Sequence, residues 1–238
     1  MADRRIEILQ ISNFDIFKES FYVIPMTVHP IYRIVIFIAK MMFNELFDGD
    51  IYGYENIPRF GPCLLACNHL SYFDPPFIGS AVPGREVFSL ARSSLFSTKF
   101  RHWLFSNMNC IPLDRKSGDV MAIKTALHLL KNGKCVMIYP EGTRSADGSI
   151  GEPLAGIGML ACKTEVPVIQ CRIFGTFEIM NRNARFFDWN QKATIVFGQP
   201  ILPKDYIVAP DSREKYKLTA TYIMNIVQNL QIPEIDIS

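Results

Sequence analysis

The sequence lacks an excess of either charge. Its 25 basic and 23 acidic residues leave a formal net charge of +2 over 238 residues. Nucleic-acid binding usually requires a strongly basic face, so this balance argues against a nucleic-acid partner. A local basic site for a small anion is still compatible with it.

A long apolar run without charge is also lacking. The most apolar stretch, residues 20–47, is broken by Pro25 and Pro30 and carries Arg33 and Lys40. These two cations are two helical turns apart and therefore share one helix face. We predict a hydrophobic helix with a narrow basic stripe that lies in a bilayer interface. Packing of this helix against the rest of the chain and spanning of the bilayer remain alternatives.

Two further absences concern the cellular compartment. The N-terminus has no apolar signal core, and no two of the six cysteines form a C-x-x-C pair. We therefore expect a protein that is not secreted, with cysteines that act as small buried hydrophobes in a reducing compartment. Metal binding or disulfide formation is the alternative for Cys63, Cys67, Cys110, Cys135, Cys162 and Cys171.

What the sequence does contain predicts a folded α/β protein. Hydrophobic residues make up 49% of the chain, enough for a full core. The segment Asp119–Lys131 has the apolar spacing of a helix and lies between two expected strands, so a β-α-β unit with parallel strands is predicted. A capping box at Asp211–Glu214 is typical of the start of a last helix. Strands are expected at 63–67, 87–91, 109–113, 134–139, 166–173 and 193–197.

These patterns predict a mixed, mostly parallel sheet flanked by helices. In such a fold the functional site lies beyond the carboxyl ends of the strands. We divide the chain into an N-terminal extension with the membrane-associating helical segment, residues 1–48, and an α/β domain, residues 49–238.

Among the four histidines, only His69 has an acidic partner in a turn-like context. It follows the apolar run Cys63–Cys67, and Asp74 comes five residues later, directly before Pro75 and Pro76. Asp followed by Pro is typical of a helix N-cap and first turn, so a turn would let the two side chains meet. Histidine is a natural proton acceptor that a carboxylate can orient. A purely structural pair, in which Asp74 caps a helix and His69 fills the turn, is the alternative.

A second polar loop follows another expected strand. Tyr139–Ser145 offers Gly142 for close backbone approach, hydroxyl groups at Thr143 and Ser145, and a bidentate guanidinium at Arg144. This composition suits a bound anion, although the spacing is not that of a Walker loop. If the strands are parallel, this loop opens onto the same sheet edge as His69.

A third loop ends the expected strand 109–113. It carries the charged pair Asp114 and Arg115. Arg115 is either a second phosphate ligand or half of a solvated ion pair.

Taken in order, three segments resemble motifs of the glycerophospholipid acyltransferase family. They are Asn-His-x4-Asp at 68–74, Ile-Pro-Leu-Asp-Arg at 111–115 and Pro-Glu-Gly-Thr-Arg-Ser at 140–145. Within the family, the chain looks most like the 1-acylglycerol-3-phosphate acyltransferases, over about residues 50–202. The resemblance implies transfer of a fatty acyl chain from an acyl carrier protein or coenzyme A thioester to lysophosphatidate, giving phosphatidate. It also implies a membrane-associated enzyme at the cytoplasmic face, without metal or cofactor.

The resemblance further implies a role for each motif residue. His69 would be the general base on the acceptor hydroxyl, and Asp74 would orient it. The implied phosphate-binding residues are Arg115, Glu141, Gly142, Thr143 and Arg144, and those implied to line the acyl region are Val166 and Pro167. Two departures from the family pattern concern the acceptor: Pro153–Gly156 stands where a basic pair often precedes a glycine, and Gln170 where a second proline is usual.

Other hypotheses remain at this point. Glycerol 3-phosphate or another lysophospholipid is the alternative acceptor. A serine hydrolase could use Ser71 with His69 and Asp74, although no G-x-S-x-G elbow is present. A metal hydrolase could add Asp114 and Glu141, although a lone histidine among oxygen ligands is poor for zinc. A non-enzymatic lipid-binding protein would explain the apolar N-terminus but not the His-x4-Asp pair.

Overall fold

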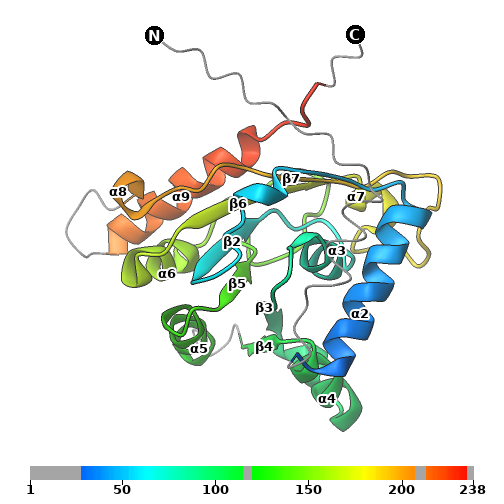
Figure 1. Cartoon of the computed structure of the whole chain (residues 1–238), viewed down its shortest axis with the longest axis horizontal. Coiled ribbons are helices and arrows are strands. Elements are labelled where there is room, and N and C mark those ends of the chain that lie inside the picture. Colours follow the sequence, from blue (N-terminus) through cyan, green and yellow to red (C-terminus); the bar gives the residue numbers. More distant parts are fainter. Residues whose placement is uncertain (1–27, 115–119, 207–212, 235–238) are drawn as a thin grey trace.

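The computed structural model describes residues 28–114, 120–206 and 213–234. Within them the strands form one seven-stranded sheet in the order β1-β7-β6-β2-β5-β3-β4 (Figure 1). The strands are β1 (Asp50–Tyr52), β2 (Cys63–Cys67), β3 (Val87–Arg92), β4 (Cys110–Leu113), β5 (Cys135–Ile138), β6 (Val168–Phe174) and β7 (Thr194–Phe197). The longer helices are α2 (Pro30–Met41), α3 (Asp74–Ala81), α4 (Lys99–Asn107), α5 (Val120–Lys131), α6 (Gly156–Thr164) and α9 (Arg213–Asn229). Shorter helical segments are η1 (Met42–Leu46), η2 (Tyr54–Asn56), η3 (Ser93–Phe96), α7 (Thr176–Met180) and α8 (Pro203–Tyr206).

The sheet is mixed but mostly parallel, as predicted. Strands β6, β2, β5, β3 and β4 run in one direction, whereas β7 pairs antiparallel with β6 and β1 pairs parallel with β7. The two strands of the predicted β-α-β unit, β4 and β5, are indeed parallel, and β3 lies between them. The carboxyl ends of β2, β5 and β6 therefore meet at one edge of the sheet.

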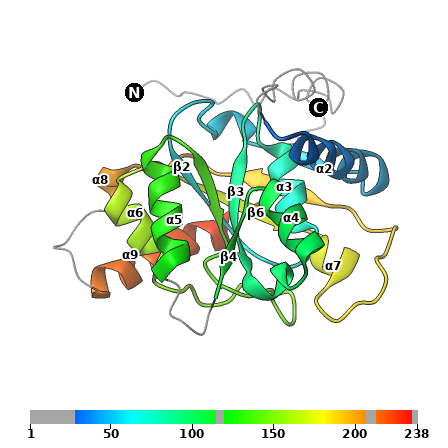
Figure 2. The same ribbon diagram turned by 90° about the horizontal axis from the view of Figure 1, so that it is seen from below.

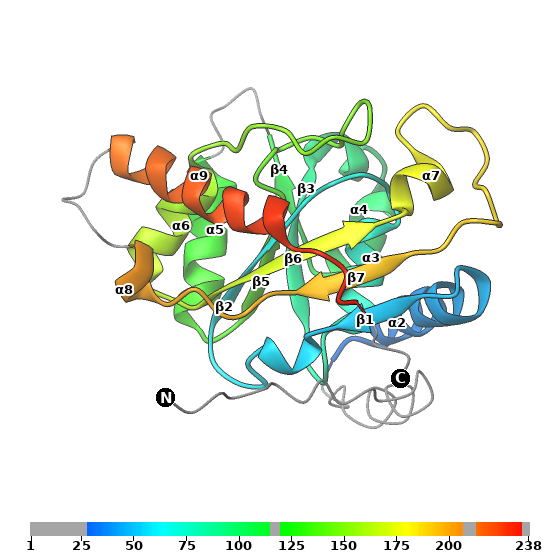
Figure 3. The same cartoon turned by 90° about the horizontal axis from the view of Figure 1, so that it is seen from above.

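Helices cover both faces of the sheet because its central strands are apolar on both sides. Along β2, Leu64 and Ala66 belong to the core cluster with α5, α6 and α9, whereas Leu65 and its flanking cysteines belong to the cluster with α2, α3 and α7. The two groups of helices lie on opposite sides of the sheet in Figures 2 and 3. All five residues of β2 are buried, which fixes the strand that leads into His69.

Helix α2 packs on the domain along one side. Tyr32 is buried and its hydroxyl accepts a hydrogen bond from the Val87 N–H at 2.9 Å. Just beyond the helix, Phe43 packs edge-on against Phe77 of α3 with ring centroids 5.3 Å apart. The division of the chain at residue 48 stays a prediction, but residues on its N-terminal side share a core with the sheet.

The predicted basic stripe of α2 is wrong for one of its two cations. Lys40 is buried, and burial lowers the pKa of its ammonium group to about 8. The periodicity placed Arg33 and Lys40 on one face but could not show that the domain covers the end of that face. Of the described helices, none is long and apolar enough to cross a membrane.

Most predicted elements are confirmed to within two residues. Strand β1 was not predicted, because a strand of three residues carries no clear period. The capping box at Asp211–Glu214 lies largely outside the described residues, and the helix that was expected after it is α9. Five of the six cysteines are buried, as expected for small hydrophobes, and Cys110 is half-buried.

Candidate active site

The turn after β2 carries the His69 motif, as predicted. Strand β2 ends at Cys67, His69 lies in the following turn, and α3 begins at Asp74. Asp74 stands at the start of this helix, as predicted: it is the first helical residue, and Phe73 is the N-cap. The carboxylate of Asp74 turns back toward the preceding turn instead of capping its own helix.

Asp74 holds this turn together. Its Oδ2 accepts hydrogen bonds from His69 Nδ1 at 2.8 Å and from the Leu70 and Ser71 N–H groups at 2.6 and 2.7 Å. Its Oδ1 accepts from the Thr176 hydroxyl at 2.7 Å. The carboxylate is fully buried, and hydrogen bonds of this kind are what make a buried charge tolerable. The predicted contact between His69 and Asp74 is thereby confirmed.

The histidine ring is held in one orientation. Because a carboxylate accepts at Nδ1, the proton of the neutral imidazole lies on Nδ1 and the Nε2 lone pair is left to act as a base. The ring stacks on Tyr139, with centroids 4.0 Å apart and planes 20° apart. The His69 side chain is 18% exposed, in contrast to Asp74 at 0%. A histidine that solvent can reach, oriented by a buried carboxylate, has the arrangement that proton abstraction needs.

The loop after β5 lies against the His69 turn. The Ser145 N–H donates to the His69 carbonyl at 2.8 Å, which places the predicted anion loop at the same sheet edge as the pair. Glu141 joins the two segments from the other side, since its Oε1 accepts from the His69 N–H at 2.9 Å and its Oε2 from the Gly151 N–H at 2.9 Å.

The geometry shows a structural role for Glu141 that the sequence did not predict. The resemblance grouped it with the phosphate-binding residues, but both carboxylate oxygens are taken by backbone donors. Burial raises the pKa of the Glu141 carboxyl, and the two N–H donors oppose that rise. Glu141 thus links the His69 turn to the segment at Gly151, and its assignment to the phosphate site stays a prediction.

Arg144 is the side chain of this loop that is best placed for an anion. Its guanidinium carbon lies 3.5 Å from the ring centroid of Tyr72, so the plane of the cation is held by an aromatic face. Its Nη1 is buried and has no hydrogen-bond partner among the described residues. A buried guanidinium nitrogen without an acceptor is costly unless a ligand supplies one.

The loop also contains two smaller predicted site residues, Gly142 and Thr143. Gly142 has a φ of +65°, and a Cβ there would lie 2.6 Å from a Leu154 methyl carbon. Glycine is therefore needed for the conformation of the loop itself. Thr143 is exposed, so its hydroxyl is available to solvent or to a ligand.

Two predicted site residues, Val166 and Pro167, are not brought to the pair, and neither is Asp114 of the metal hypothesis. Asp114 is exposed at the end of β4, three strands from β2, and Arg115 lies outside the described residues. Val166 is buried and Pro167 half-buried at the amino end of β6, where the Leu64 N–H donates to the Pro167 carbonyl at 3.0 Å. Because β2 and β6 are parallel and His69 follows the carboxyl end of β2, Val166 and Pro167 lie at the opposite sheet edge from His69. Their assignment to the acyl region stays a prediction.

Sequence reasoning missed Thr176, which is fully buried and donates to Asp74. A signal was present: Gly175-Thr176 ends the apolar strand β6, just as His69 and the 139–145 loop follow theirs. Gly175 has a φ of +78°, which makes the sharp turn possible. The neighbouring Ser71 hydroxyl donates to the Met180 carbonyl at 2.7 Å, so it is engaged away from the imidazole. This disfavours the serine hydrolase hypothesis.

The metal hydrolase hypothesis also finds no support in the described part of the chain. No three His, Cys, Asp or Glu side chains there gather in a way that could hold a metal ion. Both Asp74 oxygens and both Glu141 oxygens already accept hydrogen bonds from the protein.

Comparison with known proteins supports a family assignment. A family model described as acyltransferase matches residues 49–173. The chloroplastic 1-acyl-sn-glycerol-3-phosphate acyltransferase of Brassica napus is 30% identical over 187 residues, which cover 75% of this chain and 54% of that protein. The 1-acyl-sn-glycerol-3-phosphate acyltransferase of Bacillus subtilis is 25% identical over 170 residues, covering 71% of this chain and 81% of that one.

A solved structure supports the fold. The crystal structure of the 1-acyl-sn-glycerophosphate acyltransferase from Thermotoga maritima has a TM-score of 0.68, covers 92% of this chain and 89% of that chain, and is 24% identical in sequence. The chain spans about half the length of the plant relatives it matches.

Proposed function

The chain belongs to the acyltransferase family, and on that premise we propose that it transfers a fatty acyl chain from a thioester to the free hydroxyl of lysophosphatidate, forming phosphatidate. The observation that carries this proposal is the His69–Asp74 pair, 2.8 Å apart, beside a loop with a buried guanidinium nitrogen. The names of the relatives support the acceptor. The acyl donor is a thioester of coenzyme A or of acyl carrier protein.

The proposed reaction uses His69 as a general base. Its Nε2 takes the proton of the acceptor hydroxyl while that oxygen attacks the thioester carbonyl carbon. The new C–O ester bond forms, the C–S bond breaks, and the leaving thiolate recovers the proton from the imidazolium. Asp74 stabilises the imidazolium in between, and such a positioned base contributes about 10²–10⁴-fold in rate.

Arg144 is proposed to grip the phosphate of the acceptor. Two parallel hydrogen bonds from one guanidinium to phosphate oxygens would fix the acceptor hydroxyl relative to His69. The face of Tyr72 holds the guanidinium plane in place before the ligand arrives. Thr143 would add its exposed hydroxyl to the cradle, and Gly142, whose N–H donates to the Tyr139 carbonyl at 2.9 Å, would let the backbone come close to the phosphate.

The proposed setting is the cytoplasmic face of a membrane, because the acceptor is an amphiphile. The side of α2 that does not pack on the domain exposes Ile34, Phe37 and Ile38. This exposed side supports the hypothesis of a helix in the bilayer interface, while its packed side matches the alternative that was kept open. The two hypotheses concern different sides of one helix and are compatible with each other.

A panel of acceptors tests the proposed function. Thiol release from an acyl thioester is measured with lysophosphatidate, glycerol 3-phosphate, another lysophospholipid and uncharged monoacylglycerol. His69→Ala should lower kcat on the best acceptor by at least about 10²-fold. Lipid binding without thiol release in the wild type would overturn the enzymatic function in favour of a lipid-binding protein.

Arg144→Ala provides the test of the phosphate grip. It should raise KM for lysophosphatidate about tenfold or more and leave KM for monoacylglycerol unchanged, because only the first acceptor carries a phosphate. Arg182→Ala, which removes an exposed arginine, is the matched control and should change neither. An unchanged KM for lysophosphatidate in Arg144→Ala would refute the assignment.

A further inference from the structure

Helix α4 leaves most of its residues exposed, and only Leu104, Phe105 and Asn107 are half-buried. None of its nine residues, all of which the structure describes, is buried. Two large aromatic side chains on one side of it, Phe100 and Trp103, are 67% and 50% exposed, and their ring centroids lie 6.0 Å apart. Helices in globular proteins take most of their stability from a packed apolar face, so an exposed aromatic face indicates a further contact.

In the sequence, the charged residues between Glu86 and Asp114 are all basic. Residues 87–113, which include α4 and the strands on either side of it, contain no aspartate or glutamate. The cations in this segment are Arg92, Lys99 and Arg101, and all three are exposed. Exposed aromatic residues among cations, without acidic residues, complement a surface that is apolar beneath an anionic layer.

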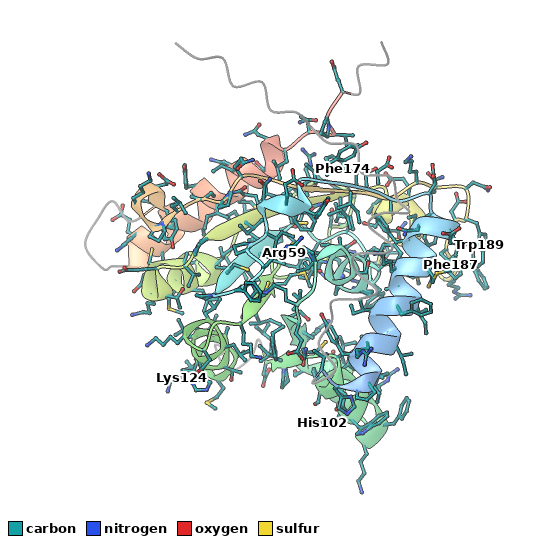
Figure 4. The ribbon with its side chains drawn as sticks, viewed as in Figure 1. Arg59, His102, Lys124, Phe174, Phe187 and Trp189 are labelled. Carbon is teal, nitrogen blue, oxygen red and sulfur yellow. The ribbon has the colours of Figure 1, made fainter. Side chains whose placement is uncertain are left out.

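Helix α4 also lies next to another helix with an exposed apolar side. It contacts α2, whose exposed residues Ile34, Phe37 and Ile38 are spaced as one helix face. Residues 20–44 likewise contain no acidic residue. Figures 1 and 2 show α2 and α4 on the same side of the sheet, and the His102 label in Figure 4 marks α4 at the outer end of that side.

We propose that α4 is a bilayer-contact element that lies in the interface of an anionic phospholipid membrane, with Phe100 and Trp103 among the acyl chains and Lys99 and Arg101 at the headgroups. The purpose of this contact rests on the proposed function. Helix α4 is reached through η3 from the carboxyl end of β3, so it starts at the sheet edge that carries His69. Contact through both α2 and α4 would fix the direction in which that edge faces the membrane, which one helix alone leaves free to rotate.

The chain offers a direct probe, because it contains two tryptophans, Trp103 and Trp189. In Figure 4 the labelled Trp189 stands well away from α4. Trp189→Phe leaves Trp103 as the sole indole. With this variant of the full chain, vesicles of phosphatidylcholine containing phosphatidylglycerol brominated along its acyl chains should quench and blue-shift Trp103 emission. Vesicle binding without quenching of Trp103 would overturn the proposal.

Partition variants give an independent measurement. Phe100→Ser combined with Trp103→Ser, and separately Lys99→Gln combined with Arg101→Gln, should each lower the partition coefficient into anionic vesicles about tenfold or more. Phe60→Ser is the matched control: Phe60 is 89% exposed but precedes β2 at the other sheet edge. An equal loss for Phe60→Ser, or no loss for the α4 variants, would refute the assignment of this surface.

Vesicle binding is measured without either substrate, so its failure is separate from a failure of the proposed function. Quenching of Trp103 in a protein that shows no acyl transfer would support the α4 contact and overturn the proposed reaction. Acyl transfer to lysophosphatidate by a protein whose Trp103 is not quenched would do the reverse. Circular dichroism and the melting temperature of each variant, which should match the wild type, check that the fold is intact.

Discussion

Thr176→Val is the sharpest test of how the acid of the pair is held. The substitution keeps the shape of a fully buried side chain and removes only the hydroxyl that donates to Asp74 Oδ1 at 2.7 Å. The other oxygen, Oδ2, keeps its three donors, so the carboxylate remains attached to the His69 turn. The change therefore isolates one hydrogen bond to a buried charge.

The expected loss can be worked out from that bond. A hydrogen bond to a charged group contributes about 1.5–3 kcal/mol, and in Thr176→Val the orphaned oxygen is buried. We expect the free energy of unfolding to fall by about 2 kcal/mol, which for a chain of this length lowers Tm by about 4–8 °C. If half of the loss appears in the barrier because Asp74 can rotate, kcat falls about fivefold.

The assay compares three proteins: wild type, Thr176→Val and Thr176→Ser. Urea unfolding gives the stability, and thiol release with saturating donor and lysophosphatidate gives kcat and KM. Thr176→Ser retains the hydroxyl and should recover most of kcat, which a merely structural defect would not explain. A valine variant with wild-type Tm and kcat would refute the argument, because Asp74 Oδ1 would then not depend on Thr176.

Three further predictions concern groups around the site. Gly175→Ala should lower the free energy of unfolding by more than about 2 kcal/mol, since its φ is +78° and a Cβ would lie 1.8 Å from the Lys192 carbonyl oxygen. Gly133→Ala is the control, because Gly133 has a φ of +75° but nothing within 4 Å of a Cβ, and this change should cost only about 1 kcal/mol. Equal losses in the two variants would contradict the steric argument. Lys40→Met should be more stable than the wild type at pH 7 by about 2 kcal/mol, and chemical unfolding at several pH values should show this advantage shrinking from pH 8 to pH 10. The sign follows because a folded pKa of about 8 leaves Lys40 neutral above that pH while the unfolded chain still binds the proton, so wild-type stability rises in that window; a difference independent of pH would refute it. Glu141→Gln should lower kcat and the free energy of unfolding, because an amide NH₂ cannot accept a hydrogen bond from a backbone N–H. KM for lysophosphatidate should stay nearly unchanged. Steady-state kinetics that show a lower KM instead would place the carboxylate against the phosphate.

Much of the fold could be predicted because its signals are local. Strand β2 was predicted at its observed bounds, since five apolar residues stand between turn-forming sequences. The contact of His69 with Asp74 could be predicted for the same reason: the partners are five residues apart and a turn joins them. Burial of most cysteines followed from the apolar runs that contain them.

The failures share a different cause. Glu141 and His69 are 72 residues apart, and Thr176 and Asp74 are 102 residues apart, so their hydrogen bonds exist only because β2 pairs with β5 on one side and β6 on the other. A single sequence gives no strand order, so neither the backbone contacts of Glu141 nor the hydrogen bond of Thr176 could be predicted.

The amino-acid sequence alone determined the α/β class, the strands, the turn that joins His69 to Asp74 and the apolar character of α2, because backbone conformation and side-chain periodicity act over a few residues. Only the tertiary structure decided that Lys40 is buried, that Tyr139 stacks on the imidazole and that Phe100 and Trp103 of α4 are exposed. Burial is a property of what packs against a residue, and that depends on parts of the chain far away in sequence.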